Sequence, residues 1–169
     1  MPLLPEFQGE SKLLEKGMWD GVVDTVGGES LTKILAATPI TMKLVQKKQI
    51  GLNYPLSDFY PQFSKGKKKN VTIEHLLTHT AGLKPYIEFY KMDGYNSREN
   101  IIDYIINQEL EYEPRTKMIY SDLGMILLFD IIEKITNTKF SQLSKRYFYS
   151  PLKMKNTFFN PPSNIKLNI

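Results

Sequence analysis

The chain has 169 residues, a length that fits one domain or a large part of one. Apolar residues make up 41%, charged residues 24% and aromatic residues 12%, which argues against a wholly disordered protein. The net charge is +4, and Lys65, Lys67, Lys68 and Lys69 account for all of the excess. We therefore expect a solvated loop at these lysines and no nucleic-acid-binding face. The absence of cysteine excludes a disulfide scaffold, a cysteine nucleophile and a thiolate metal site.

Helical periodicity begins after an irregular N-terminal segment. Residues 1–29 are broken by five glycines and form a separate segment in our division of the chain, with a short strand expected over 18–26. From Ser30 onward, apolar residues recur at helical spacing and predict a helix over 30–48. Pro39 should distort this helix, because proline lacks an N–H group. We expect residues 30–169 to form one mostly helical domain.

Loops and helices alternate along the rest of the chain. A loop with two prolines over 53–63 precedes a short helix over 73–78, which Thr72 can cap. Ser97 is expected to cap the next helix, and an extended stretch over 110–120 leads into a strong helical pattern over 122–136. A last amphipathic helix is expected over 140–148. The predicted fold class is therefore mainly α, with at most a small, incomplete antiparallel sheet.

Nothing in the sequence predicts a membrane span or a secretion signal. The longest unbroken apolar run covers residues 125–129, far short of the roughly 20 apolar residues that span a bilayer. The first residues have no basic flank and no apolar stretch of signal-peptide length. We therefore expect no membrane span, and the residues alone leave the compartment open.

Two short strings carry groups suited to nucleophilic catalysis. Ser30 and Lys33 lie three residues apart, so a helix places them on one face. A serine hydroxyl becomes a nucleophile when a base removes its proton, and a lysine of lowered pKa can serve as that base. Tyr120 is a second candidate base, with Ser121 and Asp122 as positioning or substrate-binding groups. Each string also has a structural explanation, since Ser121 or Asp122 can cap a helix and Tyr120 can simply pack.

Two histidines form a third candidate site. His75 and His79 are four residues apart, a spacing that occurs at zinc sites. They lack the His-Glu-x-x-His arrangement, and no third ligand lies at a useful spacing. A structural role for both histidines is the simpler interpretation, and we expect neither a metal nor a cofactor.

Taken together, these strings occur in the order typical of a known family. They are Ser30-x-x-Lys33, His-Leu-Leu-Thr-His-Thr-Ala-Gly-Leu at 75–83, Tyr120-Ser121-Asp122, and Pro-Leu-x-Met-x-x-Thr at 151–157. The set closely resembles the serine β-lactamase-related family, which includes class C β-lactamases, penicillin-binding DD-peptidases and related esterases. The resemblance covers residues 30–161, and its two longer strings are quite specific to that family.

The resemblance implies a role for each site residue. It makes Ser30 the acylated nucleophile, Lys33 its proton-transfer partner and Tyr120 the general base of a Tyr-x-Asn motif. The third position of that motif is Asp122 here, and its charge would pair with Lys33 and shift base duty toward Tyr120. The implied activity is an acyl-enzyme hydrolase whose substrate is a small molecule or peptide with an amide or ester bond. The implied setting is the cell envelope or the exterior of the cell.

Three departures from the family pattern support an alternative hypothesis. The string at 27–29 is Gly-Gly-Glu instead of an apolar lead-in, and Pro-Arg-Thr at 114–116 replaces Pro-Gly-Thr, so we expect this turn to be rebuilt. No Lys-Thr-Gly or His-x-Gly string follows, although the family carries that motif on a strand that supplies an oxyanion donor. The alternative is a truncated or degenerate relative without catalysis, such as an interaction module that self-associates through its uncovered sheet-facing surface. A helical binding protein of other ancestry would require the ordered strings to be a coincidence.

Overall fold

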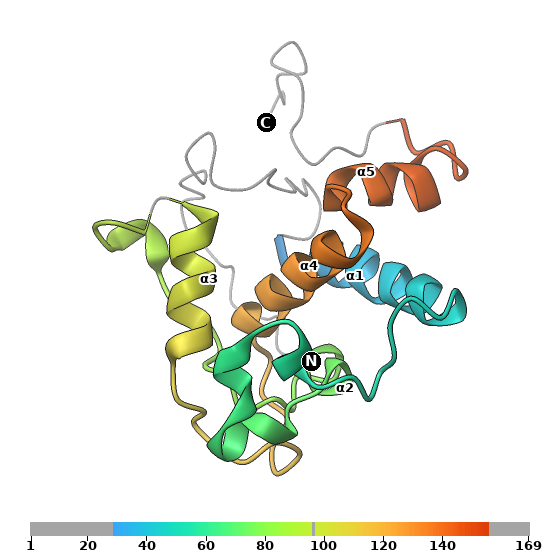
Figure 1. Cartoon of the computed structure of the whole chain (residues 1–169). Helices are drawn as coiled ribbons and strands as arrows, with labels where there is room; N and C mark the ends of the chain where they lie inside the picture. Colours follow the sequence, from blue (N-terminus) through green and yellow to red (C-terminus); the bar gives the residue numbers. More distant parts are fainter. Residues whose placement is uncertain (1–28, 96, 156–169) are drawn as a thin grey trace, which may run out of the picture.

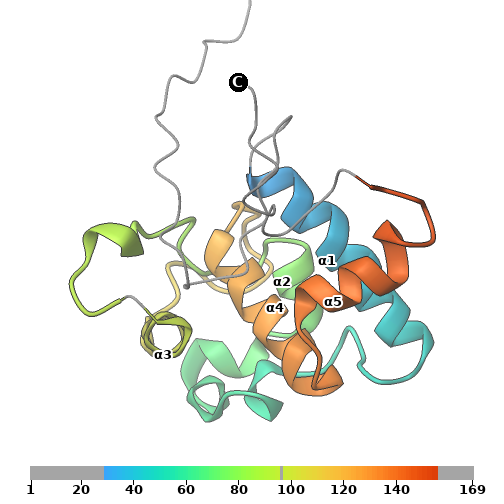
Figure 2. The same cartoon turned by 90° about the horizontal axis from the view of Figure 1, so that it is seen from above.

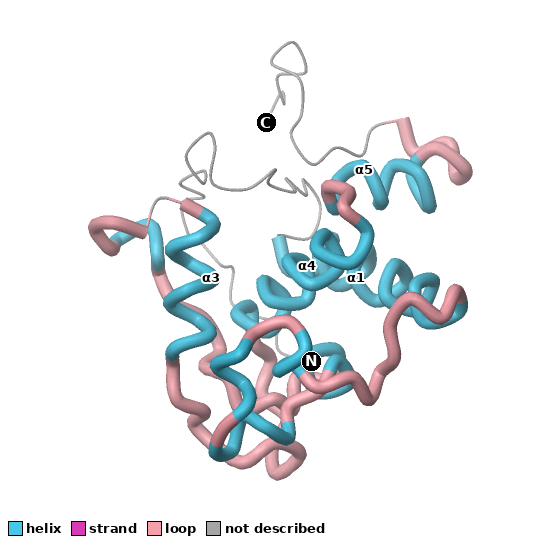
Figure 3. The backbone as a smooth tube through the Cα atoms, viewed as in Figure 1, coloured by secondary structure: helices cyan, strands magenta, loops and turns pink. Residues whose placement is uncertain are grey.

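The computed structural model describes residues 29–95 and 97–155, and helices joined by loops make up this part (Figure 3). The α-helices are α1 (Glu29–Gln46), α2 (Ile73–Leu77), α3 (Arg98–Asn107), α4 (Asp122–Thr136) and α5 (Phe140–Ser144). The shorter turns are η1 (Leu56–Asp58), η2 (Pro61–Ser64), η3 (Gly66–Asn70), η4 (Phe89–Lys91) and η5 (Lys145–Tyr149). These ranges contain no strand, only an isolated antiparallel bridge between Pro55 and Thr72. The prediction of a mainly α fold is confirmed, while the strand expected over 18–26 lies outside the described residues.

α4 lies at the centre of the helical bundle (Figure 1). It packs against α1, α2, α3 and α5, and Figure 2 shows it between α3 on one side and α1 with α5 on the other. Nine of its fifteen residues are buried, as expected for a helix that is apolar on most sides. No helix in the described ranges has both the length and the apolarity that crossing a membrane requires. Burial of Leu123, Gly124 and Met125 anchors the first turn of α4, which begins two residues after Tyr120, in the core.

α1 continues through Pro39 without a break in the helix. A proline inside a helix costs about 3 kcal/mol, because it removes one hydrogen bond and crowds the preceding turn. Ala37, Ile40 and Leu44 are fully buried on either side of the proline, and their packing offsets this cost. The helix predicted over 30–48 is thus present almost to its expected end.

The C-terminal helix predicted over 140–148 is divided into two parts. α5 ends at Ser144, and the π-helical turn η5 follows it. Both Ser144 and Tyr149 are buried, and their spacing of five positions matches one π turn rather than one α turn. Lys47 donates a hydrogen bond to the Tyr147 hydroxyl at 2.8 Å, which ties η5 to the segment after α1. The predicted continuous α-helix over 140–148 is therefore replaced by an α-helical and a π-helical part.

The lysine run between η2 and α2 is only partly solvated. Lys65, Lys67 and Lys69 are exposed, but Lys68 is only 8% exposed. The Lys68 ammonium donates to the carbonyl of Ile106 at 2.9 Å, in the last turn of α3, and lies 5.4 Å from the centre of the Phe63 ring. Carbonyl groups at a helix C-terminus attract cations. The expectation of a fully solvated loop is therefore wrong for Lys68.

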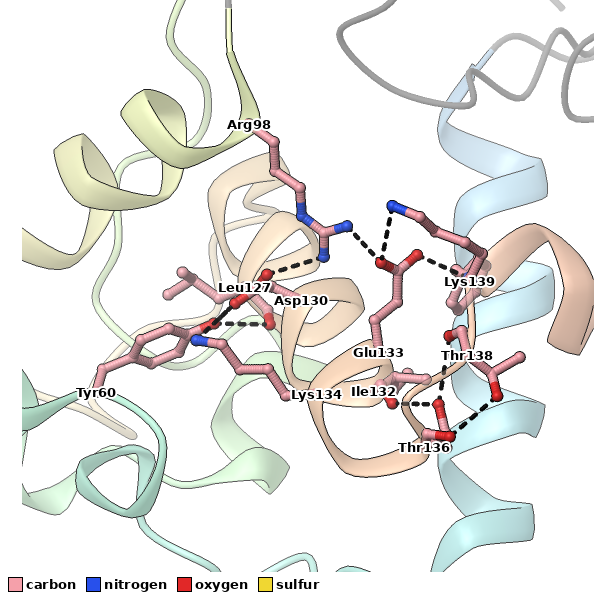
Figure 4. A network of polar contacts seen from close by, with 11 residues as sticks. Tyr60, Arg98, Leu127, Asp130, Ile132, Glu133, Lys134, Thr136, Thr138 and Lys139 are labelled. Atoms are coloured by element: carbon pink, nitrogen blue, oxygen red, sulfur yellow. Dashed lines mark hydrogen bonds and ion pairs between the residues drawn. The ribbon is translucent and has the colours of Figure 1, made fainter.

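A network of charged and polar side chains joins α3 and α4 (Figure 4). Arg98 donates to Asp130 at 2.8 Å and forms an ion pair with Glu133. The buried hydroxyl of Tyr60 and the ammonium of Lys134 reach the other oxygen of Asp130 at 2.7 and 2.9 Å. Burial acts to raise the pKa of the Asp130 carboxyl, but Lys134, Tyr60 and Arg98 outweigh it and hold the pKa below its usual value. The network thus keeps a charged carboxylate inside the bundle with several partners.

Candidate active site

The Tyr120-Ser121-Asp122 string lies where an extended segment enters α4. Ser121 is the N-cap residue, and its hydroxyl oxygen accepts from the N–H of Gly124 at 3.2 Å. The same hydroxyl donates to the carbonyl of Lys84 at 2.6 Å. The buried Ser121 hydroxyl is therefore engaged as both donor and acceptor, and it joins the start of α4 to the loop after α2.

Tyr120 makes contacts through its hydroxyl and its ring, yet its side chain reaches the surface. Its hydroxyl donates to Oδ1 of Asp122 at 3.0 Å. Its ring lies against the ring of His79, with the two centroids 4.5 Å apart and the planes at 42°. The side chain nevertheless remains 38% exposed. This arrangement presents a phenol of defined orientation to an approaching molecule.

His79 contacts the chain on both sides of Tyr120. It has a left-handed backbone, with φ of 55°, and its carbonyl accepts from the N–H of Ile119 at 3.0 Å. Its Nδ1 accepts from the N–H of Ser121 at 3.2 Å. Burial lowers the pKa of His79, while the nearby Asp122 carboxylate opposes that effect. A neutral ring with its proton on Nε2 is the form that can accept at Nδ1.

His75 is also enclosed by protein partners. Its Nδ1 lies 2.9 Å from the backbone nitrogen of Thr72, and its Nε2 lies 2.8 Å from Nε of Arg115. A neutral imidazole has one free lone pair, so it can accept only one of these two hydrogen bonds at a time. Burial lowers the pKa of His75, the Arg115 charge lowers it further, and Glu74 opposes both. The described part of the chain contains no group of three or more side chains that could hold a metal ion.

The turn at 114–116 keeps a glycine-like conformation despite its arginine. Arg115 has φ of 70°, and its N–H donates to the carbonyl of Thr80 at 2.9 Å. A left-handed conformation costs a non-glycine residue roughly 1–2 kcal/mol. The backbone hydrogen bond to Thr80 and the ion pair of the guanidinium group with Glu74, at 2.5 Å, offset part of this cost. The expectation of a rebuilt turn is therefore wrong, because these contacts hold Arg115 in place.

A narrow hollow behind the string is too small to hold a water molecule. It is lined by His75, Leu76, His79, Ala81, Gly82, Leu83, Tyr112, Ile119, Ser121 and Gly124. Gly82 has φ of 85°, and a Cβ atom there would lie 2.3 Å from the carbonyl oxygen of Tyr112. Ser121 is buried on this side, so Tyr120 and the half-buried Asp122 are the accessible side chains of the string.

Ser30 and Lys33 belong to the first two turns of α1, and their side chains lie outside the described residues. α1 packs against α4, and both helices begin on the same side of the molecule in Figures 1 and 2. The backbone thus brings the start of α1 to the side of the bundle that carries Tyr120.

Sequence reasoning missed the contact between His79 and Tyr120. It considered His79 as a metal ligand or as an isolated structural residue. The two rings are 41 positions apart in the chain, and helical periodicity links only residues within a few turns of each other. No local pattern could have paired them.

Solved structures share the fold of this chain. A beta-lactamase/D-alanine carboxypeptidase from Pseudomonas syringae matches with a TM-score of 0.66 and 22% identity, over 86% of this chain and 39% of its own. A beta-lactamase/D-alanine carboxypeptidase from Yersinia pestis, solved with citrate, matches with a TM-score of 0.65 and 23% identity, over 79% of this chain and 40% of its own. The described helices therefore correspond to the helical part of the β-lactamase and penicillin-binding protein fold.

Sequence comparison extends this similarity to the family. The N-acetylmuramyl-L-alanine amidase of Bacillus subtilis (strain 168) is 32% identical over 144 residues, which cover 78% of this chain and 32% of the amidase. A Salmonella gallinarum protein with the provisional name D-alanyl-D-alanine carboxypeptidase is 34% identical over 144 residues, which cover 78% of this chain and 33% of that protein. The family model described as Beta-lactamase matches residues 29–168, so the chain belongs to the Beta-lactamase family. It spans about a third of the length of these two relatives.

Proposed function

We propose that this chain carries the nucleophile and the base of a serine hydrolase that forms an acyl-enzyme at Ser30. The observation that carries the proposal is the Tyr120 phenol, which is partly exposed and held by Asp122 and His79 at the start of α4. Membership of the Beta-lactamase family and the hydrolase names of the relatives support the same class of reaction. The proposed substrate is an amide or an ester, as in a β-lactam, a peptidoglycan peptide or a simple ester.

The proposed reaction proceeds through two acyl transfers. Tyr120, as the phenolate, accepts the proton of the Ser30 hydroxyl while Oγ bonds to the carbonyl carbon of the substrate, and the Lys33 ammonium stabilises that phenolate. Backbone N–H groups at the N-terminus of α1 stabilise the oxyanion of the tetrahedral intermediate. Collapse of the intermediate breaks the C–N or C–O bond, and the leaving amine or alcohol takes the proton. Water then attacks the acyl ester, which restores the Ser30 hydroxyl and releases a carboxylic acid.

Ser121 and Asp122 have supporting roles in this proposal. The Ser121 hydroxyl is used in the cap and in the bond to Lys84, which suits a positioning group better than a substrate ligand. Asp122 orients the Tyr120 hydroxyl. We further propose that its charge pairs with the ammonium of Lys33, as the family resemblance implies. A cation in that position favours the phenolate that a general base requires.

Covalent labelling tests the role of Ser30. The full chain would be incubated with a fluorescent penicillin and, separately, with a fluorescent fluorophosphonate. We expect labelling of the wild-type chain, its loss in Ser30→Ala and its retention in Ser150→Ala, because Ser150 is an exposed serine outside the string. Labelling that survives Ser30→Ala would remove Ser30 from the role of nucleophile.

One observation favours the alternative, a relative without catalysis. Asp122 accepts a hydrogen bond from the Tyr120 hydroxyl, and a carboxylate in that position favours a neutral phenol as its donor. Hydrolysis of nitrocefin and p-nitrophenyl acetate separates the two proposals. Turnover that disappears in Ser30→Ala supports the hydrolase, whereas a folded wild-type chain that neither turns over nor becomes labelled supports the non-catalytic relative.

A further inference from the structure

We infer that His79 is a positioning residue that fixes the orientation of Tyr120, and through it the base of the reaction proposed above. His79 belongs to none of the proposed catalytic strings. It touches Tyr120 and both of its neighbours from a segment 41 positions away in the chain. The link to catalysis rests on the proposed function, whereas the control of Tyr120 orientation rests on the contacts alone.

Three contacts converge on Tyr120 from this single residue. The His79 carbonyl accepts from the N–H of Ile119 at 3.0 Å, and its Nδ1 accepts from the N–H of Ser121 at 3.2 Å. Between these two bonds, the imidazole ring lies 4.5 Å from the Tyr120 ring, measured between centroids. The backbone on both sides of Tyr120 and one face of its side chain are thus fixed together.

The left-handed backbone of His79 makes this arrangement possible. With φ of 55°, the residue directs its carbonyl to Ile119 while its own side chain returns to Ser121. Few side chains combine tolerance of that backbone, an acceptor two bonds from Cβ and a flat ring. Asparagine offers the first two features, since it adopts left-handed conformations readily and its Oδ1 lies where Nδ1 lies in histidine. Phenylalanine offers only the ring.

Three substitutions of His79 separate these features. His79→Asn keeps an acceptor at the Nδ1 position, His79→Gln moves the same amide one bond further out, and His79→Phe keeps the ring without an acceptor. Hydrogen exchange of the Ser121 amide, followed by NMR, reports the bond to Nδ1 directly. Loss of a hydrogen bond of ordinary strength should speed this exchange about tenfold in His79→Phe and His79→Gln. We expect His79→Asn to stay within about threefold of the wild-type rate.

The second measurement is the rate of acylation by fluorescent penicillin. A misplaced base should slow acylation about 10- to 100-fold in His79→Phe and His79→Gln, with little change in KM, because the inference assigns His79 contacts with Tyr120 and its neighbours and none with the substrate. His79→Asn should recover a large part of the rate together with the amide protection. A thermal unfolding curve for each variant shows that it is folded. Unchanged acylation in folded variants whose Ser121 amide exchanges rapidly would overturn the inference, as would slow exchange of that amide in His79→Phe.

The two measurements also separate this inference from the proposed function. If the wild-type chain is not acylated at Ser30, the proposed function fails. The amide exchange and the nuclear Overhauser contacts between the rings of His79 and Tyr120 still test the positioning. Because asparagine and glutamine have no ring, this comparison is made between the wild type and His79→Phe. Contacts between the two rings that are unchanged in His79→Phe would show that the hydrogen bond at Nδ1 does not orient Tyr120.

Discussion

Replacing Tyr60 by phenylalanine tests the charged network between α3 and α4. The Tyr60 hydroxyl is buried and donates to Oδ2 of Asp130 at 2.7 Å. A hydrogen bond to a charged partner stabilises a protein by about 1.5–3 kcal/mol. Asp130 keeps Arg98 and Lys134 after the substitution, so the loss should stay below the roughly 3–5 kcal/mol of a charge left unpaired. We therefore expect a loss of about 1.5–3 kcal/mol in unfolding free energy and a Tm lower by about 3–12 °C.

Urea unfolding followed by circular dichroism measures this loss, with Tyr54→Phe as the control. Tyr54 is 43% exposed, so its substitution should change the free energy of unfolding by less than about 0.5 kcal/mol. Because the pKa of Asp130 is lowered in the folded state, its contribution is present above about pH 4 and is lost as the pH falls through the folded pKa. The difference between wild type and Tyr60→Phe should therefore shrink at about pH 3. The reasoning would be refuted if wild type and Tyr60→Phe differed in unfolding free energy by the same amount at about pH 3 and about pH 7, or did not differ at neutral pH.

Three further predictions concern the surroundings of Tyr120. Arg115→Gly should be more stable than Arg115→Ala by about 1 kcal/mol in urea unfolding, because both variants lose the guanidinium contacts but only alanine keeps the left-handed strain. The opposite order of stability would contradict a φ of 70° at this position. Gly82→Ala should lower the free energy of unfolding by about 1–3 kcal/mol more than Gly94→Ala, since both glycines have positive φ but only a Cβ at position 82 would meet a backbone oxygen. Equal losses of unfolding free energy in the two variants would argue against that contact. Burial lowers the pKa of His75 and of His79 in the folded chain, so both histidines take up protons on unfolding below about pH 6.5. The free energy of unfolding should therefore decrease as the pH is lowered from about 7 to about 5. His79→Asn should make this fall shallower, and an unchanged slope would show that His79 does not contribute to it.

Local sequence patterns predict the helices of this chain well where the signals that start and end them are also local. α4 begins and ends at the predicted residues because Ser121 caps it and because Asn137, with φ of 45°, ends it in a left-handed conformation. The Ser97 cap of α3 is present for the same reason, with its side chain accepting from the N–H of Asn100. Periodicity and capping need only neighbouring residues, so a single sequence is sufficient for these elements.

Contacts between distant segments account for the predictions that are wrong. Lys68 is buried because the end of α3 lies next to it. Arg115 keeps a left-handed turn because its N–H bonds to the carbonyl of Thr80 and its guanidinium pairs with Glu74. The candidate site likewise has parts that local sequence predicts and parts that depend on distant contacts. Its strings are visible in the sequence, but the position of His79 against Tyr120 depends on how two loops meet. The roles of Ser30, Lys33, Tyr120, Ser121 and Asp122 stay predictions.

The burial of Lys68 gives the lysine run an uneven chemical reactivity. An acylating reagent for free amines meets Lys65, Lys67 and Lys69 at the surface, whereas the fourth amine is shielded by the end of α3. Modification of Lys68 then requires the contact between η3 and α3 to open. The extent of acylation at this one amine, read by mass spectrometry against its three neighbours, thus becomes an internal reporter of local opening in the bundle.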